Sequence, residues 1–181
     1  MMIDVNISHI YTSPEHHYFT RNRFDVGSAP TYDLESVSLK AGKGIQGDRF
    51  EYSQYPVTFI SEEVMQEVCS NLELPYDPGL FRRNIAISGI NLTQLIGKRF
   101  SIGRDYSQES TLFEGIEHCA PCTWMNAVMK KGAYRLMQGR GGLRARVIEG
   151  GVLKTGANTL ITQDEFELLD PCRALARPRL P

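Results

Sequence analysis

Short segments rich in β-branched and aromatic residues, separated by Gly, Pro and Asn, recur along the whole chain and constrain its fold most strongly. Val37 and Leu39 alternate with polar neighbours, which is the period of a half-buried strand. The segments follow one another too closely for a doubly wound α/β fold and predict a mainly β protein with a few helices (α+β), closed as a β-barrel. The expected strands span residues 3–11, 35–40, 56–60, 84–87, 99–102, 111–116, 144–148 and 159–162.

Two segments carry helical signals instead. The first spans residues 61–72, with Ser61 as N-cap, two acidic residues in the first turn and an apolar residue at every fourth position. The second is expected to begin at Pro121 and to end at Lys131, because proline favours the first helical position and Gly132 follows two lysines. The two helices interrupt the series of strands without changing the predicted fold class.

The 181 residues suffice for one domain, since a chain of this length buries roughly 70% of its unfolded surface. We expect a single domain over residues 1–181 with its core at about 35–162. An N-terminal strand and a long loop over residues 12–34 precede this core. A proline-containing tail from Asp170 follows it and is not expected to add to the core.

Charge and hydropathy exclude several classes of function. The formal net charge is −1, so indiscriminate binding to nucleic acid, which needs many basic contacts to phosphate, is not expected. No apolar run approaches the roughly 20 residues that span a bilayer, and the N-terminus lacks the features of a signal peptide. We therefore expect a cytoplasmic protein without a membrane partner, whose four cysteines are reduced thiols.

The sharpest chemical motif is the sequence His118-Cys119-Ala120-Pro121-Cys122. If a helix begins at Pro121, Cys122 lies in its first turn, where free backbone N–H groups and the helix dipole stabilise a thiolate. A thiolate can ligate a soft metal, attack sulfur or carry a persulfide. Three alternatives remain open: half of a zinc site, a thioredoxin-like motif without its usual βαβ context, and an inert buried pair.

The residues that follow this motif are unusually basic. No Asp or Glu occurs from His118 to Ile148, and this excess in a balanced chain predicts an anionic small molecule beside the cysteines. Glycines around Arg140 add backbone N–H groups that could converge on an anion. A solvated basic face is the alternative. The cations of this stretch are Lys130, Lys131, Arg135, Arg140, Arg144 and Arg146.

Two further segments have features of a ligand site. Residues 42–49 combine three glycines, two cations and Asp48, although a plain loop with Asp48 paired to Arg49 would look the same. In Phe81-Arg82-Arg83-Asn84, strand alternation sends the two arginines to opposite faces, so one of them can point into a pocket. Asn84 could serve a ligand or the backbone of a loop.

Taken in order, these segments resemble the MOSC domain, the family named after the C-terminal domain of molybdenum cofactor sulfurase. The resemblance covers about residues 35–162, most of the chain, and no single piece carries it alone. Its pieces keep the order and approximate spacing of the family and are residues 44–49, 81–85, 95–103, 121–122, 142–147 and 150–156.

The resemblance implies a barrel-like β fold around a pocket in which one cysteine ligates the molybdenum of a pyranopterin cofactor or carries sulfur. The family's cysteine follows a proline, which corresponds to Cys122 and not Cys119. A soft thiolate suits such a metal, and the basic stretch could hold the cofactor's phosphate. We therefore expect Cys122 as catalytic residue and metal ligand, with a cofactor-binding set of Arg49, Arg82, Arg83, Asn84, Arg140, Arg144 and Arg146.

The chain departs from the family pattern at three places. Phe50 stands where the family usually has His, Ala157 follows Gly156 where the family often has Asp, and residues 123–126 differ from the common forms. The loss of a histidine removes a possible ligand or hydrogen-bond donor. These departures bear on catalysis and leave the expected fold unchanged.

The resemblance implies an oxidoreductase that reduces small N-hydroxylated substrates with the molybdenum cofactor. Two alternatives remain: a persulfide carrier that delivers sulfur through Cys122 to metal–sulfur clusters or to the cofactor, and a non-catalytic cofactor-binding module. We expect no intrinsic pyridoxal phosphate site. The sequence also lacks a ferredoxin-like cysteine run and a dinucleotide fingerprint. An electron-donor protein or a cysteine desulfurase is therefore the expected partner.

Overall fold

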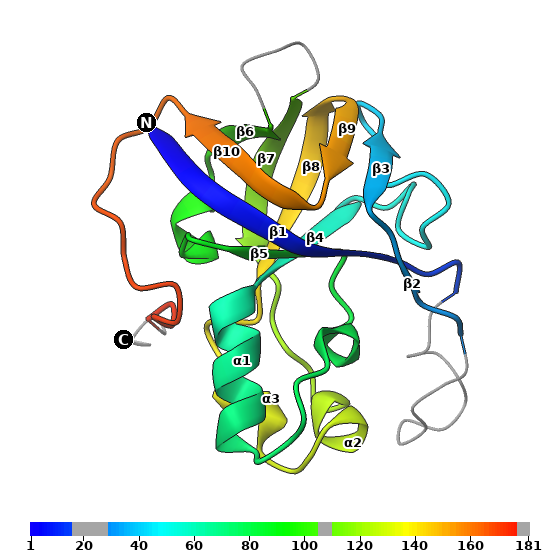
Figure 1. The fold of residues 1–181 in the computed structure, drawn as a ribbon, viewed down its shortest axis with the longest axis vertical. Coiled ribbons are helices and arrows are strands. Elements are labelled where there is room, and N and C mark those ends of the chain that lie inside the picture. Colours follow the sequence, from blue (N-terminus) through cyan, green and yellow to red (C-terminus); the bar gives the residue numbers. More distant parts are fainter. Residues whose placement is uncertain (16–28, 105–109, 177–181) are drawn as a thin grey trace.

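A computed structural model describes residues 1–15, 29–104 and 110–176, and these form a closed barrel with helices below it (Figure 1). Within the described residues, seven strands follow the order β10-β6-β7-β8-β4-β5-β1, and antiparallel pairing of β1 with β10 closes the barrel. The predicted mainly β, barrel-like fold is confirmed. The strands are β1 (Met2–Thr12), β2 (Tyr32–Asp33), β3 (Ser36–Leu39), β4 (Val57–Ser61), β5 (Ile85–Ser88), β6 (Arg99–Gly103), β7 (Thr111–His118), β8 (Leu143–Glu149), β9 (Gly151–Lys154) and β10 (Gly156–Thr162).

Alternating side chains of these strands fill the barrel. Three phenylalanines, Phe59, Phe100 and Phe113, meet inside it with ring centroids 5.2 to 6.0 Å apart, in the edge-to-face and stacked arrangements that aromatic pairs prefer. All three are buried. This aromatic cluster joins β4 to β6 and β7 across the interior of the barrel.

A second apolar cluster lies below the barrel, where α1 (Glu62–Asn71) packs on the residues after β7 (Figure 1). Ser61 caps α1 as predicted, since its side chain accepts a hydrogen bond from the Val64 N–H. Val64, Val68 and Leu72 are buried on its inner face. In the part of the chain that the structure describes, no helix is long and apolar enough to cross a membrane.

The prediction of a single helix over residues 121–131 is wrong. Two short helices, α2 (Met125–Val128) and α3 (Ala133–Leu136), replace it. The Asn126 side chain accepts hydrogen bonds from the N–H groups of Gly132 and Tyr134 and thus offers the backbone an alternative to a continuous helix. Cys122 therefore precedes the helix instead of lying in its first turn, and the argument from the helix dipole does not apply to it.

Several further segments of the chain also differ from expectation. Of the loop predicted over 12–34, residues 16–28 lie outside the described residues, and part of the remainder forms β2, which pairs with β1. The tail was not expected to add to the core, yet Cys172 packs on the lower apolar cluster. Strand β9, which pairs with β3, was missed because adjacent glycines weaken the strand signal. Two 3₁₀ helices, η2 (Pro78–Phe81) and η3 (Leu92–Leu95), were missed as well.

We expect Phe113→Ala to lower the free energy of unfolding by about 3 to 5 kcal/mol, the usual cost of removing a fully buried aromatic ring. Tyr52→Ala is the matched control, because the Tyr52 side chain is 76% exposed, and its change should stay within about 0.5 kcal/mol. Urea denaturation of the two variants measures both values. Equal effects would contradict the central position assigned to the phenylalanine cluster.

Candidate functional site

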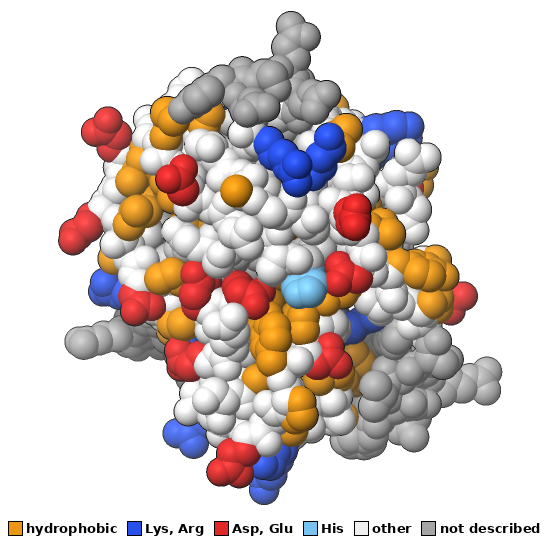
Figure 2. Space-filling model, in the orientation of Figure 1, with side chains coloured by type: hydrophobic (Ala, Val, Ile, Leu, Met, Phe, Trp, Pro, Cys, Tyr) orange, Lys and Arg blue, Asp and Glu red, His pale blue; other side chains and the backbone are white. Residues whose placement is uncertain are grey.

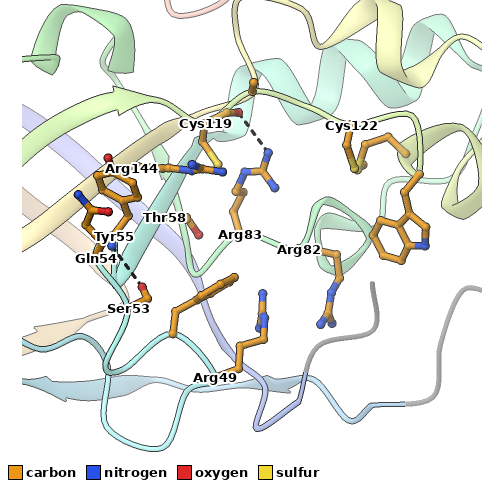
Figure 3. Close-up of a pocket in the computed structure, with 14 residues that line it drawn as sticks. Arg49, Ser53, Gln54, Tyr55, Thr58, Arg82, Arg83, Cys119, Cys122 and Arg144 are labelled. Atoms are coloured by element: carbon orange, nitrogen blue, oxygen red, sulfur yellow. Dashed lines mark hydrogen bonds between the residues drawn. The ribbon is translucent and has the colours of Figure 1, made fainter. Parts of the chain in front are cut away.

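A pocket of about 660 Å³ lies where the loop after β7 faces the start of β4 and the residues before β5 (Figure 3). Its walls come from parts of the chain that are far apart in sequence. They meet because β4 pairs with β5 on one side and with β8 on the other, and β8 pairs with β7. The pocket is lined by Arg82, Arg83 and Arg144 and by residues from the segments 49–58 and 119–125.

Arg83 holds residues 119–122, the cysteine loop, in place from within the pocket. Its Nε donates to the Gly141 carbonyl at 3.0 Å, and its Nη2 donates to the Cys119 carbonyl at 3.2 Å. Its Nη1 donates to the Phe81 carbonyl at 3.2 Å. Each of the three guanidinium nitrogens is therefore bonded to backbone, and Arg83 contributes charge and rigidity to the pocket wall.

Arg82 has an unsatisfied donor. It ends η2 in the left-handed conformation, with φ 57°, and its Nη1 donates to Thr31 Oγ1. Its Nη2 is buried and has no hydrogen-bond partner among the described residues. Burial and the neighbouring Arg49 lower the pKa of Arg82 to about 10. A buried donor without a partner is costly, and a bound anion would satisfy it.

Arg49 is oriented by the loop that the sequence marked as glycine-rich. Asp48 is buried and accepts hydrogen bonds from the backbone N–H groups of Ser13 and Phe50. One Asp48 oxygen lies 3.5 Å from Nη1 of Arg49, whose guanidinium also lies 4.7 Å from the centre of the Phe50 ring. Burial, with a smaller effect of Arg83, lowers the pKa of Arg49. Asp48 thus shapes the loop and partly balances its arginine.

Both thiols of the His118–Cys122 motif line the pocket. Cys119 is buried, and Figure 3 shows its side chain beside the guanidinium of Arg144. Cys122 is partly exposed and packs against the lower apolar cluster. The pocket therefore presents one thiol next to a cation and one in a more apolar wall.

Arg144 connects Cys119 to the opposite wall. Its Nη1 donates to Glu117 at 2.7 Å, and its guanidinium lies 5.6 Å from the centre of the Tyr55 ring. Burial alone would lower the pKa of Arg144, but contacts with Cys119 and Glu117 outweigh it, and the pKa is raised. Arg144 therefore stays charged beside the Cys119 thiol.

The glycine-rich segment 139–142 does not form the expected anion cradle. The Arg140 N–H donates to the Met137 carbonyl, and the Gly141 N–H donates to Nε2 of His118 at 2.9 Å. Gly142 has a φ of +112°, and a Cβ there would lie 2.0 Å from the Phe59 carbonyl oxygen. The glycines allow close backbone packing behind the pocket, and two of the N–H groups are already bonded.

Three residues of the predicted cofactor-binding set lie outside this pocket. Asn84 is buried and bonded to Thr58 and to the Tyr11 carbonyl. Arg140 pairs with Glu67 at 2.8 Å, on the side of the tail. Arg146 lines a neighbouring depression of about 460 Å³ and lies 3.7 Å from Glu114. The structure brings together Arg49, Arg82, Arg83, Arg144 and Cys122.

The face drawn in Figure 2 carries charges of both signs. On the face drawn in Figure 2, acidic side chains spread across the middle of the molecule, so the protein has no general basic surface there. Within the described residues, no group of three or more His, Cys, Asp or Glu side chains is placed to hold a metal ion. A metal in this pocket would need ligands from outside the described residues in addition to a cysteine.

The sequence did not predict several of the residues that line the pocket. Tyr55, Thr58 and Trp124 line it, but none of them belongs to a motif with recognisable chemistry. Trp124 had one usable signal, since it is the single tryptophan of the chain and follows the cysteine motif closely. Phe50 was noted only as a departure from the family pattern, and it supplies an aromatic wall.

Comparison with known families agrees with this architecture. The family model described as MOSC domain matches residues 15–159. The chain belongs to the MOSC domain family. Comparison with curated proteins gives no match.

Several solved structures share this fold. The YuaD protein from Bacillus subtilis superposes with a TM-score of 0.70 at 17% identity, covering 91% of this chain and 99% of that one. YiiM from Escherichia coli superposes with a TM-score of 0.59 at 17% identity, covering 96% and 75%. YiiM from Geobacillus stearothermophilus gives 0.61 at 15% identity, covering 88% and 75%. At these identities the similarity establishes the fold of the MOSC protein described here.

We expect Asn84→Ala to lower the free energy of unfolding by about 2 to 4 kcal/mol, because buried groups on Thr58 and Tyr11 would each lose a partner worth about 1–3 kcal/mol. Asn71→Ala is the control, since Asn71 makes an exposed bond on α1 and should change stability by less than about 1 kcal/mol. Urea denaturation measures both. Unchanged stability of Asn84→Ala with loss of anion binding would instead assign Asn84 to the ligand.

Proposed function

We propose that this MOSC protein binds the molybdenum cofactor in the arginine-lined pocket, with Cys122 as the metal ligand, and reduces small N-hydroxylated compounds. The observation that carries the proposal is the buried, unpartnered Nη2 of Arg82 in a pocket that also holds two thiols. The MOSC family is associated with molybdenum-cofactor binding. An anionic phosphate and a thiolate-binding metal are the two groups that such a pocket favours.

The residues present fit a cofactor of this kind. A volume of about 660 Å³ lies in the range of small-molecule and cofactor sites, which enclose about 300–1,000 Å³. A pyranopterin cofactor brings its own sulfur ligands, so a single protein thiolate completes its attachment. This agrees with the absence of a three-residue metal cluster among the described side chains.

Each group of residues has a separate task in this proposal. Arg82 and Arg49 bind the phosphate, and Arg83 holds the cysteine loop rigid. Phe50, Tyr55 and Trp124 form aromatic walls that exclude water and pack on planar ligand atoms. When bound, the molybdenum would supply the two-electron chemistry by which an N–OH group, taking up two electrons and two protons, becomes N–H and water. The electrons would come from a partner protein.

A second candidate function is a persulfide carrier. The presence of two thiols, Cys119 and Cys122, in the same pocket favours it, and the Arg144 guanidinium lies beside Cys119. A cysteine desulfurase would be the partner, and Cys122 would hand the terminal sulfur to an acceptor.

A non-catalytic cofactor-binding module would bind the metal without catalysing a reaction. An activity assay with an artificial reductant therefore separates it from the enzyme.

Removal of the proposed ligand gives the first test. In protein purified from a host that makes the cofactor, we expect near-stoichiometric molybdenum, and we expect Cys122→Ser to lose most of it because a hydroxyl is a poor ligand for a soft metal. Cys172→Ser is the matched control, since Cys172 lies outside the pocket lining, and it should retain the metal. Metal analysis and released pterin fluorescence measure the outcome.

Two results would redirect the assignment. Folded wild-type protein without molybdenum or pterin, but with cyanide-labile sulfur that disappears in Cys122→Ser, would favour the persulfide carrier. Retention of metal in Cys122→Ser with loss in Cys119→Ser would transfer the ligand role to the buried thiol.

We expect Arg82→Gln to weaken binding of the isolated cofactor by about 10- to 100-fold, the loss of one charge-assisted hydrogen bond. Arg99→Gln is the control, because Arg99 is exposed on β6 and does not line the pocket. Quenching of Trp124 fluorescence reports binding in both variants. Equal affinities would show that the unpartnered Nη2 does not meet the ligand.

A further inference from the structure

We propose that His118 is a positioning residue for the pocket: its neutral imidazole accepts the Gly141 N–H and thereby fixes Arg83 and the cysteine loop, and protonation of the ring releases them. This inference rests on the proposed function, because it assumes that Arg83 and its neighbours hold an anionic ligand. His118 itself does not line the pocket. Its effect would pass through Gly141.

A short series of hydrogen bonds connects the histidine to the pocket. Nε2 of His118 accepts from the Gly141 N–H at 2.9 Å. The carbonyl of the same glycine accepts from Nε of Arg83 at 3.0 Å, and Nη2 of Arg83 donates to the Cys119 carbonyl at 3.2 Å. The Cys119 N–H in turn donates to the Gly142 carbonyl at 2.8 Å. Gly141 therefore joins the imidazole directly to the Arg83 guanidinium, and through Arg83 to the backbone of Cys119.

Gly141 has little freedom to move independently. A Cβ built on it would lie 2.5 Å from the Cys119 carbonyl oxygen and 2.9 Å from Cδ of Pro121. The peptide of Gly141 is thus packed directly against the backbone between the two pocket cysteines. A rotation of this peptide would displace that backbone as well as the hydrogen bond to Arg83.

The surroundings of His118 keep its ring neutral. Burial is the largest cause of its lowered pKa, and Arg83, from the segment before β5, and Arg144, on β8, add to it. Glu117, on the same strand as His118, acts in the opposite direction. Cys119 follows it in the chain, and its thiol faces Arg144. Because Nε2 is an acceptor, the ring proton resides on Nδ1.

The direction of the pH effect distinguishes a positioning role of His118 from a purely electrostatic effect of its charge. A protonated imidazole cannot accept the Gly141 N–H, so anion affinity should fall as the pH drops below the ordinary histidine range. A new positive charge that acted only at a distance would strengthen anion binding instead. The two roles therefore predict opposite signs.

The test uses sulfate, whose charge is constant across this pH range, and the fluorescence of Trp124, the single tryptophan of the chain, which lines the pocket. We expect the wild-type affinity to be about fivefold lower at about pH 5 than at about pH 8, the effect of losing one hydrogen bond. His118→Gln keeps an acceptor and does not titrate. It should bind like wild type at high pH and lose the pH dependence, while His118→Leu should bind weakly throughout. His9→Gln, outside the pocket, is the control.

Other results would overturn the inference. Wild-type affinity that rises or stays constant at low pH, or a pH dependence that persists in His118→Gln, would remove the positioning role and leave the anion pocket intact. Failure of wild type to bind sulfate at either pH would count against the proposed function. In that case the amide NMR signal of Gly141 decides the inference, which requires this signal to titrate in wild type and not in His118→Gln.

Discussion

Pairing of β1 with β10 is the constraint on which the rest of the structure depends. The register runs from Met2 opposite Ile161 to Ile7 opposite Gly156 and converts an open sheet into a barrel without free edges among its seven strands. Closure fixes the curvature of the sheet in which β7, β8, β4 and β5 are neighbours. The pocket lies beside these neighbouring strands, where the start of β4, the residues before β5 and the end of β7 meet.

In the candidate site, hydrogen bonds to backbone groups fix the positions of several side chains. Arg83 donates its hydrogen bonds to backbone carbonyl groups, and His118 accepts one from the Gly141 N–H. Arg82 differs from these residues, because its buried Nη2 has no hydrogen-bond partner among the described residues. The positive charge is thus divided between residues that shape the pocket and the two arginines, Arg49 and Arg82, that we assign to a ligand.

Local patterns predicted the parts of the fold that local forces decide. The barrel, most strands and the Ser61 cap followed from alternation and capping chemistry. The prediction of the second helix failed because the Asn126 side chain accepts hydrogen bonds from the N–H groups of Gly132 and Tyr134, beyond the reach of a regular helical turn. The same limit applied to the site. Arg82 and Arg83 were found as a pair, but neither the unsatisfied donor of one nor the three carbonyl partners of the other can be read from sequence. Arg140 belonged to the same basic stretch as Arg144, but its bonds to Glu67 and to the Cys172 carbonyl place it on the side of the tail.

Diffraction at the molybdenum absorption edge, on crystals of protein purified from a host that makes the cofactor, tests the central claim most directly. The account predicts an anomalous peak inside the pocket, within bonding distance of Sγ of Cys122, with the cofactor's phosphate beside Arg82. A metal peak outside the pocket, or no molybdenum in the folded protein, would contradict it.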